Sequence, residues 1–174
     1  MSSSSHPSLA PRSGSNLVLL DSEPGEFALY SWKNLMIACW STRATGPAME
    51  RVSLAREAMG HDHPEGVSVI YLIAENAGLP TPEARAGVEQ LMTRYRDQRA
   101  CLALVVQGEG FWASAMRGAI TGVRLLVPGQ FPMRICGDVA EVVEWLPELH
   151  EERTGIKVEP EALRRVLEGL MAEL

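Results

Sequence analysis

The sequence is poor in cysteine and has no secretory leader pattern. Its 174 residues include three cysteines. This odd number, with no CxxC spacing, argues against a disulfide framework or a zinc site. Cys39, Cys101 and Cys136 lie in or beside apolar runs, so we expect them to be small buried hydrophobes. The N-terminus has no basic region followed by an apolar one, and we therefore expect a cytoplasmic protein.

Positive charge is not gathered on any one part of the chain. The net charge is -6, and the segment from Asp138 to Leu174 accounts for all of it with ten acidic and four basic residues. The rest of the chain is balanced. Fourteen of the sixteen basic residues are arginine, which we attribute to genome composition before phosphate recognition. Without a basic face, we expect no nucleic-acid partner.

Catalytic signatures are also missing. The chain has no Walker-type phosphate loop, no GxGxxG after a strand and no GxSxG elbow. Gly108-Glu109-Gly110 lacks the further glycine and the lysine of a phosphate loop, so we interpret it as a turn. His61-Asp62-His63 has no third cluster of metal ligands, and no partner can be assigned to His150. We therefore expect neither enzymatic activity, nor a cofactor, nor a metal site.

The clearest structural signal that is present lies in residues 67–99. Ten residues rich in β-branched and aromatic types predict a buried strand, which Gly78 and Pro80 follow with a turn. Thr81 then stands at an N-cap position, with Pro82 at the first helical position and Glu83 in the first turn. This unit predicts a strand, a loop and a capped helix.

Similar strands and helices alternate along residues 35–153, which predicts a mostly parallel sheet with right-handed crossovers. Asn34 is expected to take a positive φ in a hairpin turn, which would add antiparallel strands at one edge. Gly60 is expected to end the first helix, and Pro147 to kink or end a later one. Pro132 indicates that the last strand lies near an edge. The expected fold is α/β, with a mixed sheet of about five to six strands and flanking helices. Strands are predicted at 16–20, 27–32, 35–40, 67–76, 100–106 and 131–136, and helices at 47–59, 82–99, 111–127, 139–153 and 160–174.

The chain divides into three parts by composition. Residues 1–15 contain seven serines and predict a disordered tail. Residues 16–154 form the α/β domain, and residues 155–174 an added amphipathic helix. That helix has a leucine stripe spaced 4-3-4, which either folds back on its own domain or pairs with a second copy of the chain. The stripe consists of Leu163, Leu167, Leu170 and Leu174.

The hairpin followed by β-α units resembles the STAS domain of SpoIIAA-like proteins, the anti-sigma-factor antagonists, over roughly residues 17–153. In that family a hydrophobic strand leads to an Asp-Ser-Ser-Gly turn, whose second serine opens a helix and is phosphorylated. After the strand that contains Val69-Ile70-Tyr71-Leu72, Thr81 takes the place of that serine. Leu79, Pro80 and Pro82 depart from the motif.

The sequence Thr81-Pro82-Glu83-Ala84-Arg85 also resembles the opening of this helix in a looser group of bacterial STAS/SEC14-like proteins, which implies no activity. The antagonist resemblance implies a non-enzymatic protein-interaction module of bacterial signalling, with a protein partner and a phospho-switch at Thr81. A phosphate there would meet free N–H groups of the helix. The residues alone leave the simpler interpretation open, in which Thr81 is only a helix cap.

The apolar helix at 111–127 supports an alternative function, a small-molecule or lipid-head-group binding domain. Its polar stripe includes Arg117 and Arg124, which argue against a membrane span. The helix either packs on the sheet with a narrow polar edge or meets a partner or membrane surface, of which we favour the first. The candidate partner or ligand surface consists of Pro80, Glu83, Arg85, Trp112, Arg117 and Arg124.

Overall fold

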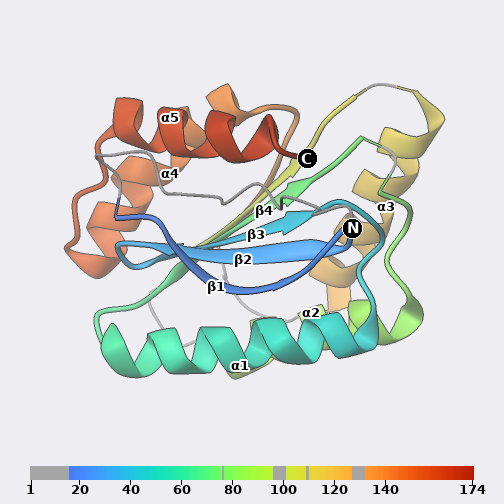
Figure 1. Cartoon of the computed structure of the whole chain (residues 1–174), viewed down its shortest axis with the longest axis horizontal. Coiled ribbons are helices and arrows are strands. Elements are labelled where there is room, and N and C mark those ends of the chain that lie inside the picture. Colours follow the sequence, from blue (N-terminus) through green and yellow to red (C-terminus); the bar gives the residue numbers. More distant parts are fainter. Residues whose placement is uncertain (1–15, 76, 96–100, 109, 127–131) are drawn as a thin grey trace, which may run out of the picture.

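A six-stranded mixed sheet lies between two layers of helices (Figure 1). The computed structural model describes residues 16–75, 77–95, 101–108, 110–126 and 132–174. The spatial order of the strands is their order in the chain. The predicted tail at 1–15 and the expected ends of several elements lie outside the described residues.

The sheet begins with an antiparallel meander and continues with parallel strands. The meander pairs β1 with β2 and β2 with β3, and β3 to β6 are parallel neighbours. This arrangement confirms the predicted α/β fold with a mixed, mostly parallel sheet. It also places the last strand at an edge, as Pro132 indicated. The strands are β1 (Val18–Glu23), β2 (Phe27–Trp32), β3 (Leu35–Trp40), β4 (Ser68–Ile73), β5 (Leu102–Val106) and β6 (Met133–Cys136).

The helices divide between the two faces of the sheet. Each crossover from β3 to β6 moves one strand along in the same direction, so right-handed connections put the three crossover helices on one face. Those helices are α1 (Gly46–Asp62), α2 (Pro82–Arg94) and α3 (Phe111–Leu126). The opposite face is covered by α4 (Val139–Thr154) and α5 (Pro160–Met171). Two apolar clusters, one for each face, form the core.

Two helices continue past residues that were expected to interrupt them. Helix α1 continues through Gly60 to Asp62, because Met59 still packs in the core. Helix α4 continues through Pro147, where buried Leu146 and His150 on either side hold the helix against the sheet. Burial of this face offsets the cost of about 3 kcal/mol for proline inside a helix.

In the hairpin turn between β2 and β3, the residue with a positive φ is not the one that was predicted. Lys33, with a φ of 54°, takes the left-handed conformation expected of Asn34. The Asn34 side chain is instead buried and donates to the Gly66 carbonyl at 2.9 Å. Strand β1 also runs past the turn predicted at Asp21, because Arg51 of α1 binds both Asp21 and Glu23.

The C-terminal helix is packed on its own domain. Leu163, Leu167 and Leu170 are buried in the apolar cluster of that face, and Leu174 is partly buried against it. Of the two alternatives for this stripe, folding back is therefore the one that the structure has, and the four leucines are not an open dimer face. The three cysteines are free and buried, as predicted.

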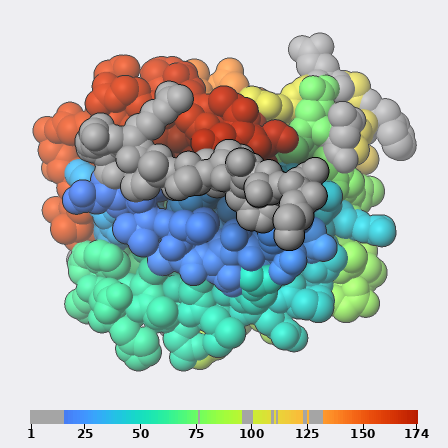
Figure 2. Space-filling model, viewed as in Figure 1, coloured from blue at the N-terminus to red at the C-terminus, as the bar shows by residue number. Residues whose placement is uncertain are grey.

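Strand β1 forms an exposed edge of the sheet. Figure 2 shows the N-terminal strands in blue between the helical layers. Val18, Leu19 and Leu20 are 53%, 52% and 40% exposed. The apolar side chains in this part of β1 are therefore open to solvent, unlike those of β3 and β4, which are buried throughout.

Candidate functional site

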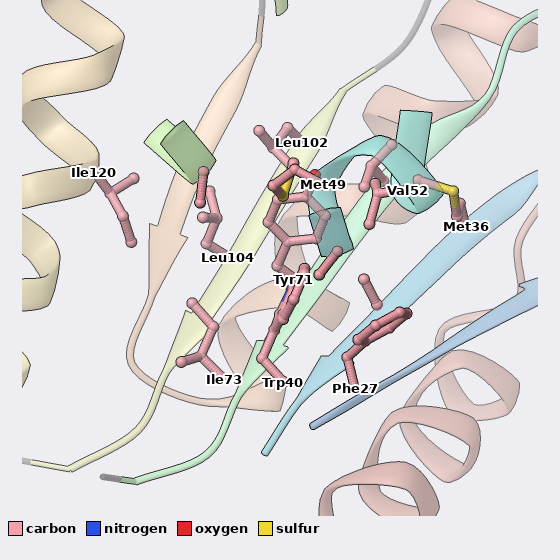
Figure 3. Packing of buried hydrophobic residues seen from close by; sticks show 14 of the residues in the cluster. Phe27, Met36, Trp40, Met49, Val52, Tyr71, Ile73, Leu102, Leu104 and Ile120 are labelled. Atoms are coloured by element: carbon pink, nitrogen blue, oxygen red, sulfur yellow. The ribbon is translucent and has the colours of Figure 1, made fainter. Parts of the chain in front are cut away.

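An apolar pocket lies between the sheet and the three crossover helices, where β3 and β4 end. Trp40 and Ile73 are the last residues of those strands, and both line it. Tyr71 and Leu104 continue the floor, and Ile120 of α3, labelled with them in Figure 3, forms part of the wall. The carboxyl ends of parallel strands are the usual place for ligand sites in open α/β sheets. We refer to this space as the main pocket.

The walls of the main pocket are apolar and adaptable. Met49 from α1, Met116 from α3 and Met133 from β6 line it from three different elements. The volume is about 60 Å³, room for about four to six water molecules at the roughly 10–15 Å³ that each requires. Methionine side chains rearrange readily to fit irregular shapes, so the walls suit a small apolar group better than water.

The mouth of the main pocket faces the loops that follow β3 and β4. Thr42 and Arg85 line the pocket and are exposed, whereas Trp40 and Tyr71 are buried. The Thr81 N–H donates to the Ala44 carbonyl at 3.0 Å and joins the two loops. This bond holds the rim of the mouth in place.

A smaller pocket of about 30 Å³ adjoins the main one, since Tyr71 and Val88 line both. Tyr95 also lines it, and the Tyr95 hydroxyl is buried with no hydrogen-bond partner among the described residues. The Arg56 guanidinium stacks on the Tyr95 ring at 4.5 Å from its centroid. Apart from these groups, the smaller pocket is lined by apolar side chains and Tyr71.

Thr81 is a helix cap. Its hydroxyl accepts a hydrogen bond from the Ala84 N–H at 3.2 Å. Hydrogen bonds to its own N–H and to the Thr81 hydroxyl keep the pKa of Glu83 below its usual range. Thr81 is therefore the N-cap of α2 in this structure, and its phosphorylation stays a prediction.

The other candidate residues separate into two groups. Pro80 and Arg85 line the main pocket. The Arg117 guanidinium donates to the carbonyls of Val106 and Gly108, at 3.4 and 3.1 Å, and so holds the turn between β5 and α3. Trp112 packs partly buried against the core. The Arg124 side chain lies outside the described residues.

A buried polar cluster lies on the opposite face of the sheet. Asn34 Nδ2 donates to Gly66, so Asn34 Oδ1 accepts from His150 Nε2 at 2.9 Å. His150 Nδ1 then accepts from the Ser68 hydroxyl at 2.7 Å. The Cys101 sulfur lies 3.0 Å from the Ser68 oxygen. We refer to Asn34, Ser68, Cys101 and His150 as the polar cluster.

The polar cluster has the residue types of a nucleophilic site but no access for a substrate. Ser68 and His150 have no exposed surface, and neither pocket described above reaches them. Burial, with a smaller contribution from Lys33, lowers the pKa of His150 to about 4, although Glu65 acts in the opposite direction. The imidazole is therefore neutral at pH 7, and the cluster joins α4 to the sheet.

The loop after α1 contains a side-chain hydrogen bond between His63 and Glu65. His63 Nδ1 lies 3.0 Å from a Glu65 carboxylate oxygen. Within the described part of the chain, no group of three or more histidine, cysteine, aspartate or glutamate side chains is arranged to hold a metal ion.

The sequence indicated neither the pocket nor the polar cluster. The methionines of the main pocket come from α1, α3 and β6, and no local pattern joins them. Asn34 and His150 are 116 positions apart. The one usable signal was the position of His150, four residues after Leu146 and so on the same face of the predicted helix.

Comparison of the chain with protein-family models and with curated proteins finds no match. The resemblance to STAS domains therefore stays a prediction, and function has to be argued from the geometry. Among the described residues, no helix combines the length and the apolar character needed to cross a bilayer.

Proposed function

We propose that the protein is a non-enzymatic binding domain for a small apolar molecule, which occupies the main pocket. The observation that carries the proposal is the pocket itself: an apolar space with methionine walls, open at the carboxyl ends of the parallel strands. Ligand sites are typically concave, mostly apolar and equipped with few polar groups. This is the small-molecule alternative of the sequence analysis, with α3 as one wall.

The chemistry around the pocket supports binding over catalysis. Arg85 is the only side chain with a formal charge among the described lining residues, and no histidine or cysteine lines the pocket. Tyr71 lines its floor, and burial raises the pKa of that phenol far above its usual value. A phenol that stays protonated at neutral pH is a poor general base.

Filling the pocket tests the proposal. The probe is N-phenyl-1-naphthylamine, a neutral dye whose emission rises in apolar surroundings. Ala119→Phe places a ring from α3 into the pocket, and we expect it to reduce dye binding at least tenfold. Ala140→Phe, the same change at an exposed position of α4, is the matched control. Equal dye binding by both variants and the wild type would show that the main pocket is not the site.

A second candidate is the regulatory protein-interaction module, and one observation favours it. Leu79 is 46% exposed beside Thr81, where Pro80 and Arg85 also reach the surface. A charge at Thr81 would change this surface next to the pocket mouth. Pull-down from native lysate with wild type, Thr81→Glu and the uncharged cap variant Thr81→Asn tests it. A partner lost only with Thr81→Glu supports the switch, and a partner set shared by all three variants contradicts it.

A further inference from the structure

We propose that the ligand of the main pocket is a short amphipathic carboxylate, and that Arg85 at the mouth binds its charged end. This inference rests on the proposed function and adds the chemical class of the ligand. It rests on two observations: the interior of the main pocket is apolar, and the cationic side chain of Arg85 lies at its opening.

The interior of the main pocket excludes the charged end of a ligand. Beyond the mouth, its walls are formed by buried apolar side chains and by Tyr71, and a charge buried without partners is very costly. An apolar tail can replace water there at about 0.8 kcal/mol per methylene group. A ligand with both parts must therefore enter tail first and keep its charge at the mouth.

Arg85 is placed to receive that charge. It lies in the first turn of α2, lines the pocket and is exposed to solvent. No hydrogen bond or ion pair joins its guanidinium to another described residue. The Glu83 carboxylate, which senses the charge of Arg85, is hydrogen-bonded to its own N–H and to Thr81. The guanidinium therefore keeps its donors for a ligand.

The type of anion follows from the geometry of the donor. Guanidinium donates two parallel hydrogen bonds to a carboxylate, a pairing that lysine cannot reproduce. A single lining arginine balances the single charge of a carboxylate. Arg43 lies next to Gly78, a residue that lines the pocket: its Cβ is 3.4 Å from the position that a Cβ on Gly78 would take. It adds positive charge near the opening.

The experiment compares carboxylates with alcohols of equal chain length. Butanoate to octanoate, and butanol to octanol, are used to displace N-phenyl-1-naphthylamine from wild type, Arg85→Gln and the exposed control Arg165→Gln. We expect affinity to rise about fourfold per methylene until the pocket is filled. Wild type and Arg165→Gln should prefer each carboxylate to its alcohol by about five- to tenfold.

Arg85→Gln should remove that preference and leave alcohol binding unchanged. High salt should weaken carboxylate binding and spare alcohol binding. If the dye and the alcohols bind but Arg85→Gln leaves the carboxylates unaffected, the inference is wrong and the proposed function stands. If neither the dye nor any chain binds, both are wrong. Binding to phosphatidylglycerol vesicles without binding of free carboxylates would also overturn the inference, and would assign Arg85 to a lipid surface.

Discussion

The surroundings of His150 decide the role of its imidazole. Both ring nitrogens are engaged, one by Asn34 and the other by Ser68, and the residue has no exposed surface. Protonation would turn the accepting nitrogen into a second donor, so the Ser68 hydroxyl would have to rotate and accept, and a positive charge would be buried among neutral groups. Burial of the polar cluster therefore favours the neutral imidazole.

This arrangement predicts a pH-dependent stability. The pKa of His150 is lowered to about 4 in the folded state, whereas an unfolded histidine titrates near 6.5. Above about pH 6.5 the imidazole is neutral in both states, and its full contribution is present. As the pH falls from about 6.5 towards 4, only the unfolded state takes up the proton, so the free energy of unfolding drops by roughly 1.4 kcal/mol per pH unit.

Urea unfolding at a series of pH values checks this prediction. His150→Gln should be less stable at pH 7 and should lose the extra slope between about pH 6.5 and 4. His61→Gln, the same change at an exposed position, should retain the wild-type slope. Identical slopes in all three proteins would mean that His150 titrates with the same pKa in the folded and unfolded states.

The role of Thr81 as a cap gives a second prediction at this scale. Thr81→Ala should destabilise the protein by about 1 kcal/mol, because the Ala84 N–H loses its acceptor. Thr81→Asn, which can also cap, should lie within a few tenths of a kcal/mol of the wild type. Chemical denaturation measures both values. An unchanged stability in Thr81→Ala would mean that the cap is not formed in solution.

Among the elements, α5 owes its position to packing. Its leucine stripe matches a short coiled-coil pattern, but two heptads provide little stability without further contacts. The apolar face of the sheet offers a larger area, and Val158 just before the helix joins the same cluster. The leucine stripe is therefore covered within its own domain, whereas the sequence also allowed it to pair with a second copy of the chain.

Truncation of a leucine in α5 tests this packing. Leu167→Ala should destabilise the protein by about 2–5 kcal/mol, the usual cost of such a change in a core. Leu54→Ala on α1, where the side chain is 67% exposed, should change stability by less than about 0.5 kcal/mol. Thermal unfolding together with solution mass distinguishes packing of α5 on its own domain from dimer formation. A loss of mass by half in Leu167→Ala, with unchanged stability, would support a dimer helix.

For the whole molecule, the main pocket predicts a coupling between ligand and stability. A ligand that binds only the folded chain raises the free energy of unfolding by about 2.7 kcal/mol at a hundred times its Kd. Saturating octanol should therefore raise the melting temperature of the wild type. Ala119→Phe, in which the pocket is filled, should not respond. Equal shifts in wild type and Ala119→Phe would place the alcohol elsewhere on the protein.

Much of the fold could be predicted from the sequence, and little of the site. The strands ending at Trp32 and Trp40 were predicted residue for residue, because their apolar runs are bounded by turn residues and both strands are fully paired. Helix α1 runs past the end predicted at Gly60, and α4 continues through Pro147 to within one residue of its predicted end, since burial overrides both local signals. Arg117, a candidate for a partner or ligand surface, donates to two backbone carbonyls that are close in the chain, a contact that the sequence did not indicate.

The sequence by itself determined the alternation of strands and helices, the cap at Thr81 and the burial of the cysteines. These features depend on residues within a few positions of one another or on side-chain polarity alone. Only the tertiary structure decided that α5 folds back, that His150 joins Asn34 and Ser68, and that three methionines from separate elements enclose a pocket. Such contacts join residues distant in the chain, and the space between packed elements depends on side-chain shape, which no local pattern encodes.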